Sequence, residues 1–564
     1  MAKKTWGIML LCFLALLFIP PKAVAADSGV CGDHLSWEVD DAGTLTIKGT
    51  GDMYDGMTWN SSEVHTVVIE PGVTSIGGDA FRLQRNLIKV SIPESVTRIG
   101  GRAFAWCSNL NDVTIPNGVT IIDSQAFQGC AKLASIRIPN SVVEIGEFAF
   151  YNCDSLTNIA IPASVTNIGM EAFSACNSLS KIDVDSKNSA YRSTDGVLFD
   201  KGQTTLLAFP GARGSSYAIP SGVSIIETGA FTGCKNLTVI TIPDSVTSVR
   251  RENAGFASCS SLQEIRVAEG NPAYVSINGV LFNKDVTTLV GYPGAYGGSY
   301  IVPNSVITIP VDTFEYCENL SDITILNSVT SIGAQAFLGC SNLTQVVISG
   351  SVTKLGSNIF LGCPIKDVYY GGDETQWNAI EGVKDALSDS VTVHYRFDDV
   401  PSTAYYADAV NWAVAQGITN GTTETTFSPN NTCTTANIIT FLWRANGSPE
   451  PKVSNPFSDV QTGQYYAKAA VWAYEKDMVT GRTFGGNANC TRAATMKYLW
   501  ILSGRPSSSS NPFTDVSNNA DYAQAVAWAV AQGVTNGKTA TTFAPDDTCT
   551  RGQIATFLLR YYMR

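Results

Sequence analysis

The chain has 564 residues, of which 44% are hydrophobic and 15% charged, and its formal net charge is −12. This length predicts several domains, and the hydrophobic content excludes a largely disordered chain. The acidic charge and the lack of any basic run argue against a nucleic-acid-binding protein.

The first 25 residues have the pattern of a secretory signal peptide. Lys3 and Lys4 precede the apolar run 7–19, and the small residues 23–25 follow as a cleavage signal. The alternative is a membrane anchor, but the apolar run is too short for one. No later stretch is long and apolar enough to span a bilayer. We therefore expect a Sec-exported, extracellular chain without a transmembrane segment after cleavage.

A 23-residue repeat dominates the middle of the chain. Its clearest copy is VTRIGGRAFAWCSNLNDVTIPNG, which opens at Val96. The valines that mark the register are Val73, Val96, Val119, Val142, Val165, Val223, Val246, Val306, Val329 and Val352. In each copy the pattern L-x-x-V-x-I predicts a strand with one apolar face, and stacked copies can share a continuous core. A fixed period of this length predicts a solenoid.

Two further positions of this repeat are nearly constant. The first is an aromatic ladder: Phe104, Phe127, Phe150, Phe173, Phe231, Phe314, Phe337 and Phe360. The second, three residues after the aromatic position, is cysteine: Cys107, Cys130, Cys153, Cys176, Cys234, Cys259, Cys317, Cys340 and Cys363. One cysteine per coil is a stacking pattern, and no C-x-x-C occurs. We interpret these thiols as small buried apolar groups, with a disulfide framework or metal ligation as the alternative.

The ends and interruptions of the repeat divide the rest of this region. Residues 26–72 are predicted to cap the solenoid of 73–363, and 364–396 to form its C-terminal cap and junction. Two insertions, 185–220 and 268–303, copy each other and alternate like β-hairpins that project from the coils. Their candidate partner-contact residues are Tyr191, Tyr274, Tyr292 and Tyr296. Hairpins that merely lengthen the solenoid are the alternative.

A second repeat, with a longer period, fills the last part of the chain. The motif Phe-x-Asp-Val opens three units, 397–453, 454–509 and 510–564. Each unit is predicted to hold a helix with one tryptophan, a Gly-rich loop and a second helix that starts at Cys-Thr. The threonine is an expected N-cap, and a polar residue three positions later would close a capping box. Gln553 keeps that box, Asn437 is a weak version, and Ala494 cannot form it.

These two repeats resemble known families. The pattern L-x-x-I-x-I-P…S-V-T-x-I-G-x-x-A-F-x-x-C resembles the BspA-like leucine-rich repeats of bacterial surface proteins. The three later units resemble S-layer homology modules, whose Thr-Arg-Ala-Glu signature stands here as Thr434-Thr-Ala-Asn, Thr491-Arg-Ala-Ala and Thr550-Arg-Gly-Gln. The resemblance implies a β-rich leucine-rich-repeat solenoid followed by a mainly α-helical triplet.

The second resemblance also implies a ligand. Triplets of S-layer homology modules bind anionic secondary cell-wall polysaccharide, often through a pyruvate ketal. Carried over to this chain, Arg492 and Arg551 would meet a carboxylate beside the helix starts at Thr491 and Thr550, where orphan backbone N–H groups also favour an anion. Thr435 replaces the arginine in the first unit, which puts that pocket in doubt. Arginines that are only solvated first-turn residues are the alternative.

No pattern for catalysis appears. The three histidines lie far from one another, and no zinc-protease, nucleophile-elbow or phosphate-loop motif is present. We expect no enzyme, cofactor or metal. The prediction is a secreted surface protein that its helical units hold at the wall while the solenoid recognises a protein or host-surface partner. A structural S-layer or envelope spacer is the first alternative, and a wall- or polysaccharide-acting enzyme the second.

Overall fold

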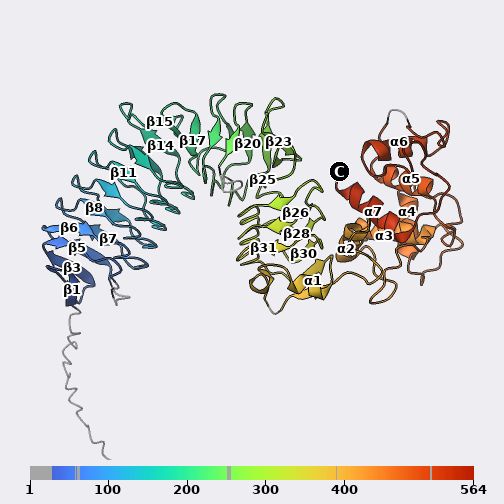
Figure 1. Ribbon diagram of the computed structural model, residues 1–564, viewed down its shortest axis with the longest axis horizontal. Coiled ribbons are helices and arrows are strands. Elements are labelled where there is room, and N and C mark those ends of the chain that lie inside the picture. The colour runs from blue at the N-terminus through green and yellow to red at the C-terminus, as the bar shows by residue number, and fades with distance from the viewer. Residues whose placement is uncertain (1–27, 58, 60–63, 251–255, 389, 509–510) are drawn as a thin grey trace, which may run out of the picture. The chain divides into compact units, whose positions relative to one another are not determined.

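The computed structural model describes residues 28–57, 59, 64–250, 256–388, 390–508 and 511–564. The predicted signal peptide and its cleavage site lie outside these residues. The chain divides into two compact units, residues 1–173 with 185–189 and residues 174–184 with 190–564. Figure 1 traces the elements of both units along the chain.

The first unit is a stack of short β-coils. Its strands are β1 (Ser28–Gly32), β2 (Leu35–Val39), β3 (Thr44–Gly49), β4 (Gly51–Asp52), β5 (Thr66–Ile69), β6 (Val73–Ile76), β7 (Lys89–Ser91), β8 (Arg98–Ile99), β9 (Asp112–Val113), β10 (Ile121–Ile122), β11 (Glu144–Ile145), β12 (Asn158–Ile161) and β13 (Asn167–Ile168). An antiparallel β1-β2-β3 meander starts one sheet, and β5, β7 and β9 extend it in parallel. The meander occupies the segment expected to cap the solenoid.

Each coil contributes a second strand that the sequence did not reveal. The residues Val-Thr-x-Ile form β6, β8, β10, β11 and β13, which stack in parallel into a second sheet. The register advances by one repeat per strand, so Arg98 aligns with Ile121 and Ile121 with Glu144. Most of these strands contain only two residues. A run that short carries no alternating pattern, and for that reason the sequence predicted one strand per coil.

The interior of the coils is an aromatic stack. Phe81, Phe104, Phe127 and Phe150 are 0% exposed, and successive ring centroids lie 5.2, 5.3 and 5.5 Å apart with nearly parallel planes. Trp59 extends the stack at the N-terminal end, 5.6 Å from Phe81. Each ring therefore fills the space between its two neighbours, and the core runs along the repeats without a gap.

The ladder cysteines satisfy backbone carbonyls inside this stack. The Cys107 thiol donates to the carbonyl oxygen of Phe81, in the preceding coil, at 3.0 Å, and Cys130 donates likewise to Phe104 at 3.3 Å. The same bond recurs from Cys153, Cys234, Cys259, Cys340 and Cys363. Burial raises the pKa of the Cys107 thiol to about 12. None of these thiols forms a disulfide, and all except the half-buried Cys363 are buried, in agreement with their interpretation as small buried groups.

The second unit continues the coils and then becomes helical. Its strands are β14 (Lys181–Val184), β15 (Tyr191–Thr194), β16 (Val197–Asp200), β17 (Thr205–Ala208), β18 (Ser216–Ala218), β19 (Ile225–Ile226), β20 (Val239–Ile242), β21 (Ser248–Val249), β22 (Glu264–Val267), β23 (Tyr274–Ile277), β24 (Val280–Asn283), β25 (Leu289–Gly291), β26 (Gly298–Ile301), β27 (Thr308–Ile309), β28 (Leu320–Ile325), β29 (Ser331–Ile332), β30 (Gln345–Ile348), β31 (Lys354–Leu355), β32 (Asp367–Tyr370) and β33 (Thr392–His394). The sheet β26-β28-β30-β32-β33 closes the solenoid, beside the short helices α1 (Glu374–Asn378) and η1 (Val383–Asp385).

The insertions differ from the projecting hairpins that the sequence predicted. Strands β15 and β16 form an antiparallel hairpin, but β17 then pairs in parallel with β19, and β18 with β20. The second half of the first insertion is thus an irregular coil. Phe209 lies 5.4 Å from Phe231, and Tyr292 of the second insertion lies 4.7 Å from Phe314, so both take ladder positions. Only the first half of each insertion departs from the stack.

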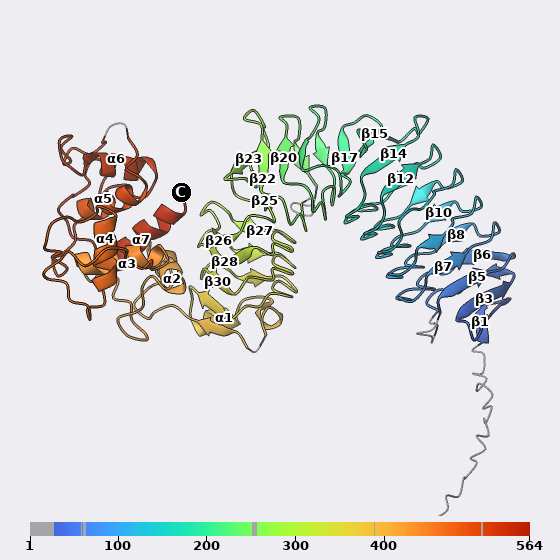
Figure 2. The ribbon, with the colours of Figure 1, turned by 180° about the vertical axis from the view of Figure 1, so that it is seen from behind.

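The helical region packs as a closed set of helix pairs (Figures 1 and 2). Its helices are α2 (Ala407–Ala415), α3 (Thr435–Ala445), α4 (Ala467–Glu475), α5 (Arg492–Leu502), α6 (Ala523–Ala531) and α7 (Arg551–Tyr562). Helix α3 packs against α4, α5 against α6, and α7 returns to α2. The tryptophans Trp412, Trp472 and Trp528 are buried in one shared core.

Candidate functional site

Three backbone hydrogen bonds join the centre of the helical region into a ring. The Cys433 N–H donates to Cys549, the Cys490 N–H to Cys433 and the Cys549 N–H to Cys490, at 2.8, 3.0 and 3.1 Å. Each cysteine immediately precedes the N-cap threonine of a second helix. The three helices α3, α5 and α7 therefore start around one point, and each start faces a loop of another repeat unit.

The threonines at these starts are N-caps. The hydroxyl oxygens of Thr434, Thr491 and Thr550 accept from the N–H groups three residues later. Asn437 and Gln553 both complete capping boxes, so the Asn437 box forms although the sequence ranked it as weak. The predicted site residues Thr491 and Thr550 thus use their side chains to start their own helices.

The expected orphan N–H groups at the helix starts are not orphans, which corrects the sequence prediction. The N–H groups of Arg492 and Ala493 donate to the carbonyl oxygens of Asp547 and Pro545, at 2.8 and 3.0 Å. Those of Arg551 and Gly552 donate to Asn431 and Pro429, both at 2.9 Å. The prediction was wrong because it treated each helix alone, whereas a loop of the next unit satisfies these donors.

Arg492 is packed between the second and third repeat units. Its side chain is 6% exposed, and Nε donates to the carbonyl oxygen of Phe543 at 2.9 Å. The guanidinium lies over the Phe543 and Phe557 rings, 4.8 and 5.5 Å from their centroids. Burial lowers the pKa of Arg492, and its Nη2 is a buried donor with no acceptor among the described residues. The side chain is therefore neither solvated nor openly presented.

Arg551 occupies the equivalent position between the third and first units and is more accessible. Its Nε donates to the carbonyl oxygen of Phe427 at 2.9 Å, and Nη2 donates to that of Asn420 at 2.7 Å. The guanidinium lies 4.5 Å from the Phe427 ring centroid. Burial lowers its pKa, yet the side chain is only half-buried. Nη1 has no acceptor among the described residues.

Exposed tyrosines border two of the three junctions. Tyr406 packs on α7 so closely that a Cβ on Gly552 would lie 3.0 Å from its ring, and the neighbouring Tyr405 is 65% exposed. Tyr465 is 59% exposed, and its hydroxyl accepts from Asn437 Nδ2 at 2.7 Å. At the remaining junction Asp521 takes the corresponding place and forms an ion pair with Lys497. The sequence analysis did not single out these residues.

A repeated aspartate fixes the loops that the arginines bind. The carboxylate of Asp399 accepts from the N–H groups of Phe427 and Ser428, both at 2.7 Å. Asp459 and Asp515 make the equivalent pairs of bonds. Hydrogen bonds from the Phe484 and Gly485 N–H groups lower the pKa of Asp459. The Asp of Phe-x-Asp-Val could have been recognised from its threefold recurrence.

The predicted contact tyrosines of the insertions divide into two groups. Tyr274 and Tyr292 are 8% and 3% exposed, which corrects their prediction as partner contacts. The Tyr274 hydroxyl accepts from the Val249 N–H at 2.7 Å, and Tyr292 stacks in the ladder. Tyr191 and Tyr296 are only partly buried. Tyr292 is buried because the second half of its insertion builds a coil, whereas Tyr274, in the hairpin strand β23, packs into the core of the preceding coils.

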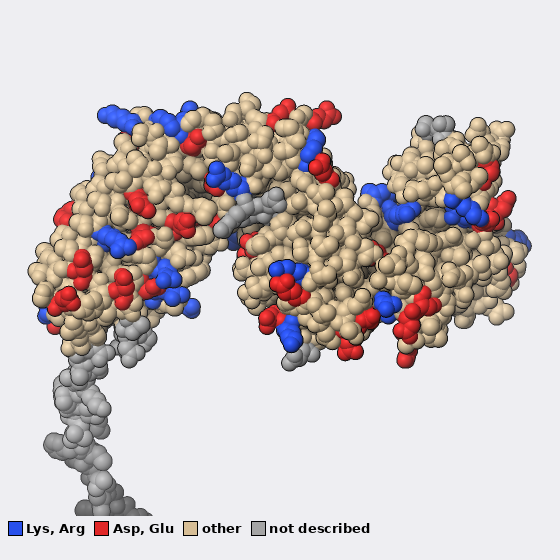
Figure 3. All heavy atoms as spheres, in the orientation of Figure 1, with Lys and Arg blue, Asp and Glu red and all other residues tan. Residues whose placement is uncertain are grey.

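Charge does not mark a site on the solenoid. On the face shown in Figure 3 acidic and basic side chains are scattered among uncharged ones. Several exposed strand charges neutralise each other, for example Lys89 with Asp112 at 2.8 Å. In the described ranges no group of His, Cys, Asp and Glu side chains could hold a metal ion. The same ranges contain no helix long and apolar enough to cross a bilayer.

Comparison with known families agrees with this architecture. The BspA type leucine rich repeat region matches at residues 74–194, 207–286 and 298–379, in six copies that span half of the chain. The chain belongs to this family. The S-layer homology domain matches at residues 396–434 and 512–555, within the first and third helical units. That match indicates association with a cell wall or S-layer at the cell surface.

Two proteins with similar sequences are enzymes. The amylopullulanase of Thermoanaerobacterium thermosulfurigenes is 26% identical over 214 residues, which are 34% of this chain and 11% of that protein. The exoglucanase XynX of Acetivibrio thermocellus is 27% identical over 181 residues, 30% of this chain and 16% of that one. This chain thus spans a small part of those enzymes, and both family regions matched here are non-catalytic.

The similar solved structures are repeat proteins. A leucine-rich repeat protein of Eubacterium ventriosum is 25% identical, with a TM-score of 0.40 over 61% of this chain and 96% of its own. A leucine rich cell surface protein of Faecalibacterium prausnitzii is 29% identical, with a TM-score of 0.39 over 63% and 98%.

Proposed function

We propose that the helical region holds this protein non-covalently on a bacterial wall by binding acidic secondary wall polysaccharide. All three helical units act as S-layer homology modules in this proposal. The middle unit lies outside the family match but has the same three features as the other two units. They are the N-cap threonine, the aspartate that accepts two loop N–H groups, and the cysteine backbone hydrogen bond of the central ring. The solenoid then presents a recognition surface for a protein or host-surface partner.

The junction of the third and first units is the best-equipped polysaccharide site. Its supporting observation is the half-buried guanidinium of Arg551, whose Nη1 has no acceptor among the described residues. Hydrogen bonds from Nε and Nη2 to Phe427 and Asn420 fix the guanidinium plane. A carboxylate that accepts from Nη1 would gain a charge-assisted hydrogen bond without first ordering the side chain.

The other two junctions are weaker candidates. Arg492 is almost fully buried, so a ligand reaches its unpaired Nη2 only if the Phe543 loop moves. Thr435 offers no charge, and its hydroxyl already donates to the Ala488 carbonyl oxygen at 3.3 Å. We therefore expect unequal contributions, with Arg551 first, Arg492 second and the Thr435 junction last.

Co-sedimentation of the full chain with purified walls tests this ranking. Arg551→Gln should reduce the pelleted fraction strongly, since one charge-assisted hydrogen bond accounts for about a tenfold change in affinity. Arg505→Gln is the matched control, because Arg505 is an exposed arginine of the same region that pairs with Asp477. Circular dichroism verifies the helices of each variant.

Chemical treatment of the walls identifies the ligand. Walls stripped of secondary polysaccharide should no longer pellet the protein. Mild acid, which removes ketals and leaves the chain of sugars, tests whether the carboxylate belongs to a pyruvate ketal. Pelleting that survives stripping, or that is equal for Arg551→Gln and the parent chain, would refute polysaccharide anchoring at this junction.

Recognition by the solenoid requires a more selective test than deletion of the insertions. Phe209 and Tyr292 belong to the core, so deletion would disrupt the coils. Exposed substitutions at the hairpins, Arg192→Glu and Ile277→Ser, leave the ladder intact. If they abolish capture of a surface partner while wall binding persists, recognition is supported. If neither the parent protein nor the variants capture a partner, the spacer function is favoured. Turnover of a glycan by the purified protein would favour an enzyme.

A further inference from the structure

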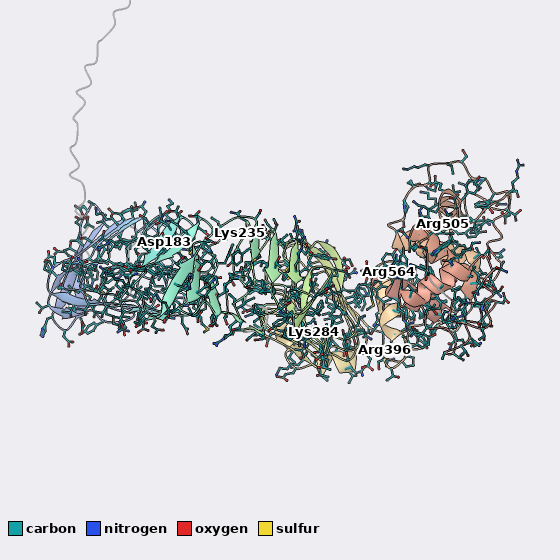
Figure 4. All side chains as sticks on the ribbon, turned by 90° about the horizontal axis from the view of Figure 1, so that it is seen from above. Asp183, Lys235, Lys284, Arg396, Arg505 and Arg564 are labelled. Atoms are coloured by element: carbon teal, nitrogen blue, oxygen red, sulfur yellow. The ribbon has the colours of Figure 1, made fainter. Side chains whose placement is uncertain are left out.

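A cavity of about 450 Å³ lies inside the second compact unit, between the later coils and the helical region. Its side-chain lining includes Tyr296 and Tyr300 from the second insertion and Trp412, Arg444, Tyr562 and Arg564 from the helices and the segment after them. Figure 4 shows Arg564 at the border between the strands and the helices. None of the residues at the Arg551 junction lines this cavity.

The two regions that form the cavity are fixed to each other by direct bonds. The Asp408 carboxylate of α2 accepts from the Asn327 N–H at 2.9 Å, and Gln416 Nε2 donates to Asp322 Oδ1 at 2.9 Å. Leu326 and Ile301 of the coils pack with the helical core. The cavity therefore has two walls of different secondary structure that remain together.

The lining carries positive charge and no acidic side chain. Arg444 Nη1 donates to the Ile418 carbonyl oxygen at 3.2 Å. Arg564 Nε donates to that of Tyr561 at 2.9 Å, and its guanidinium lies over the Tyr561 and Trp528 rings, 3.9 and 5.0 Å from their centroids. Neither guanidinium forms an ion pair with a described residue. Asp322, which bonds the lining residues Ser299 and Gln416, is not itself part of the lining. Two positioned guanidinium groups without a carboxylate partner favour an anion.

Aromatic rings stand on both walls. Tyr296 and Tyr300 have ring centroids 6.3 Å apart, and the Tyr300 ring lies 4.9 Å from the buried Tyr292. Across from them Trp412 and Tyr562 lie 5.7 Å apart, and the Tyr562 hydroxyl is held by the Ala445 carbonyl oxygen. Rigid aromatic faces combined with Asn278, Ser299 and Gln416 suit a ligand with apolar ring faces and polar edges.

We propose that this cavity binds an acidic saccharide of one or two sugar units, with its carboxylate on Arg444 and Arg564 and its ring faces on the tyrosines. The site is separate from the wall-binding junction. Because it draws residues from both the coils and the helices, the bound sugar would contact the solenoid and its anchor at once.

Calorimetric titration of the full chain with digalacturonate tests the proposal. The dimethyl ester of the same disaccharide is the matched probe, since it keeps the shape and removes both charges. Digalacturonate should bind, and the ester should bind about tenfold more weakly or less. Added salt should weaken the acid and leave the ester unaffected. Absence of digalacturonate binding, or equal affinity for acid and ester, would overturn the proposal.

Variants locate the binding. Arg444→Gln and Arg564→Gln should each weaken digalacturonate binding about tenfold, and Arg505→Gln should not change it. Tyr300→Phe keeps the ring and should bind nearly as well as the parent chain. Arg551→Gln should also leave the affinity unchanged. If Arg551→Gln alone abolishes binding, the saccharide occupies the wall-binding junction and this second site is refuted.

Discussion

The two repeat regions of this protein use repetition in opposite ways. In the solenoid the repeat is translated, so each residue contacts its own counterpart in the next coil, as the Phe104–Phe127–Phe150 stack shows. In the helical region the repeat is rotated, and three units close on themselves through Cys433, Cys490 and Cys549. An open stack can add or lose coils, whereas a closed ring has a fixed number of members.

The difference determines where a site can arise. Equivalent residues in a stack are neighbours, and the exposed strand charges pair with one another, as Lys89 does with Asp112. Away from the centre of the ring, equivalent residues face different units and lie at separate junctions, as Arg492 and Arg551 do. Sequence changes in individual units then make the three junctions unlike: Arg492, Arg551 and Thr435 occupy equivalent positions, and Asp521 stands where the other two junctions have Tyr405 and Tyr465.

The largest expected effect comes from breaking the solenoid stack. Phe127→Ala removes a fully buried ring between two others and should lower the free energy of unfolding by about 3–5 kcal/mol. Val143→Ala, at a position 45% exposed, is the control and should cost little. Urea unfolding followed by tryptophan fluorescence measures both. Helical ellipticity of the later region should keep its own transition, because a stack transmits energy only to neighbouring repeats.

The second effect concerns the contact between stack and ring. Burial raises the pKa of Asp408 to about 6, against the Asn327 N–H bond that lowers it. The folded state therefore keeps a proton that the unfolded chain has lost, and this group's stabilising contribution disappears as pH rises from about 4 to 6. Asp408→Asn should remove that fall, worth about 3 kcal/mol.

Thermal denaturation at several pH values, with the parent chain and Asp408→Asn measured side by side, checks this assignment. The exposed Asp546→Asn serves as control. A parent and an Asp408→Asn profile with the same slope between pH 4 and 6 would contradict it.

A smaller loss is expected at the helix starts. Thr550→Ala removes the N-cap of α7 and half of its capping box, at a cost of about 1 kcal/mol. Thr550→Ser should retain most of the stability because its hydroxyl can accept the same Gln553 N–H. Chemical denaturation followed at 222 nm distinguishes them, and equal loss in both would show that the methyl group matters instead of the cap.

The smallest effect is a coupling energy, and it tests the ring directly. Asp515 holds the N–H of Phe543, and Arg492 of another unit holds the carbonyl oxygen of the same residue. Asp515→Ala and Arg492→Gln should couple by about 0.5 kcal/mol or more in a double-mutant cycle. Phe127 and Phe337 lie far apart along the chain, so the stability losses of Phe127→Ala and Phe337→Ala should be additive. Coupling between these two, but none between Asp515→Ala and Arg492→Gln, would contradict the distinction between an open stack and a closed ring.

Local sequence signals predicted much of the framework and less of the site. The aromatic ladder, the buried thiols and the capping threonines each follow from a pattern within a few tens of residues. Phe209 and Tyr292 escaped the ladder because irregular insertions conceal their spacing. The exposure of Tyr405 and Tyr465 could not be predicted because each is followed by a second tyrosine, and only tertiary packing decides which member of the pair is more buried.

By itself the sequence determined the two periods, the residues that recur at each position and the family to which the chain belongs. Tertiary structure decided which recurrent groups remain available. It satisfied the helix-start N–H groups with loops of neighbouring units, buried Arg492 while leaving Arg551 half-open, and assembled a cationic cavity from residues far apart in the chain. The physical reason is that hydrogen-bond partners and solvent exposure are properties of contacts between repeats, which a period along one chain does not encode.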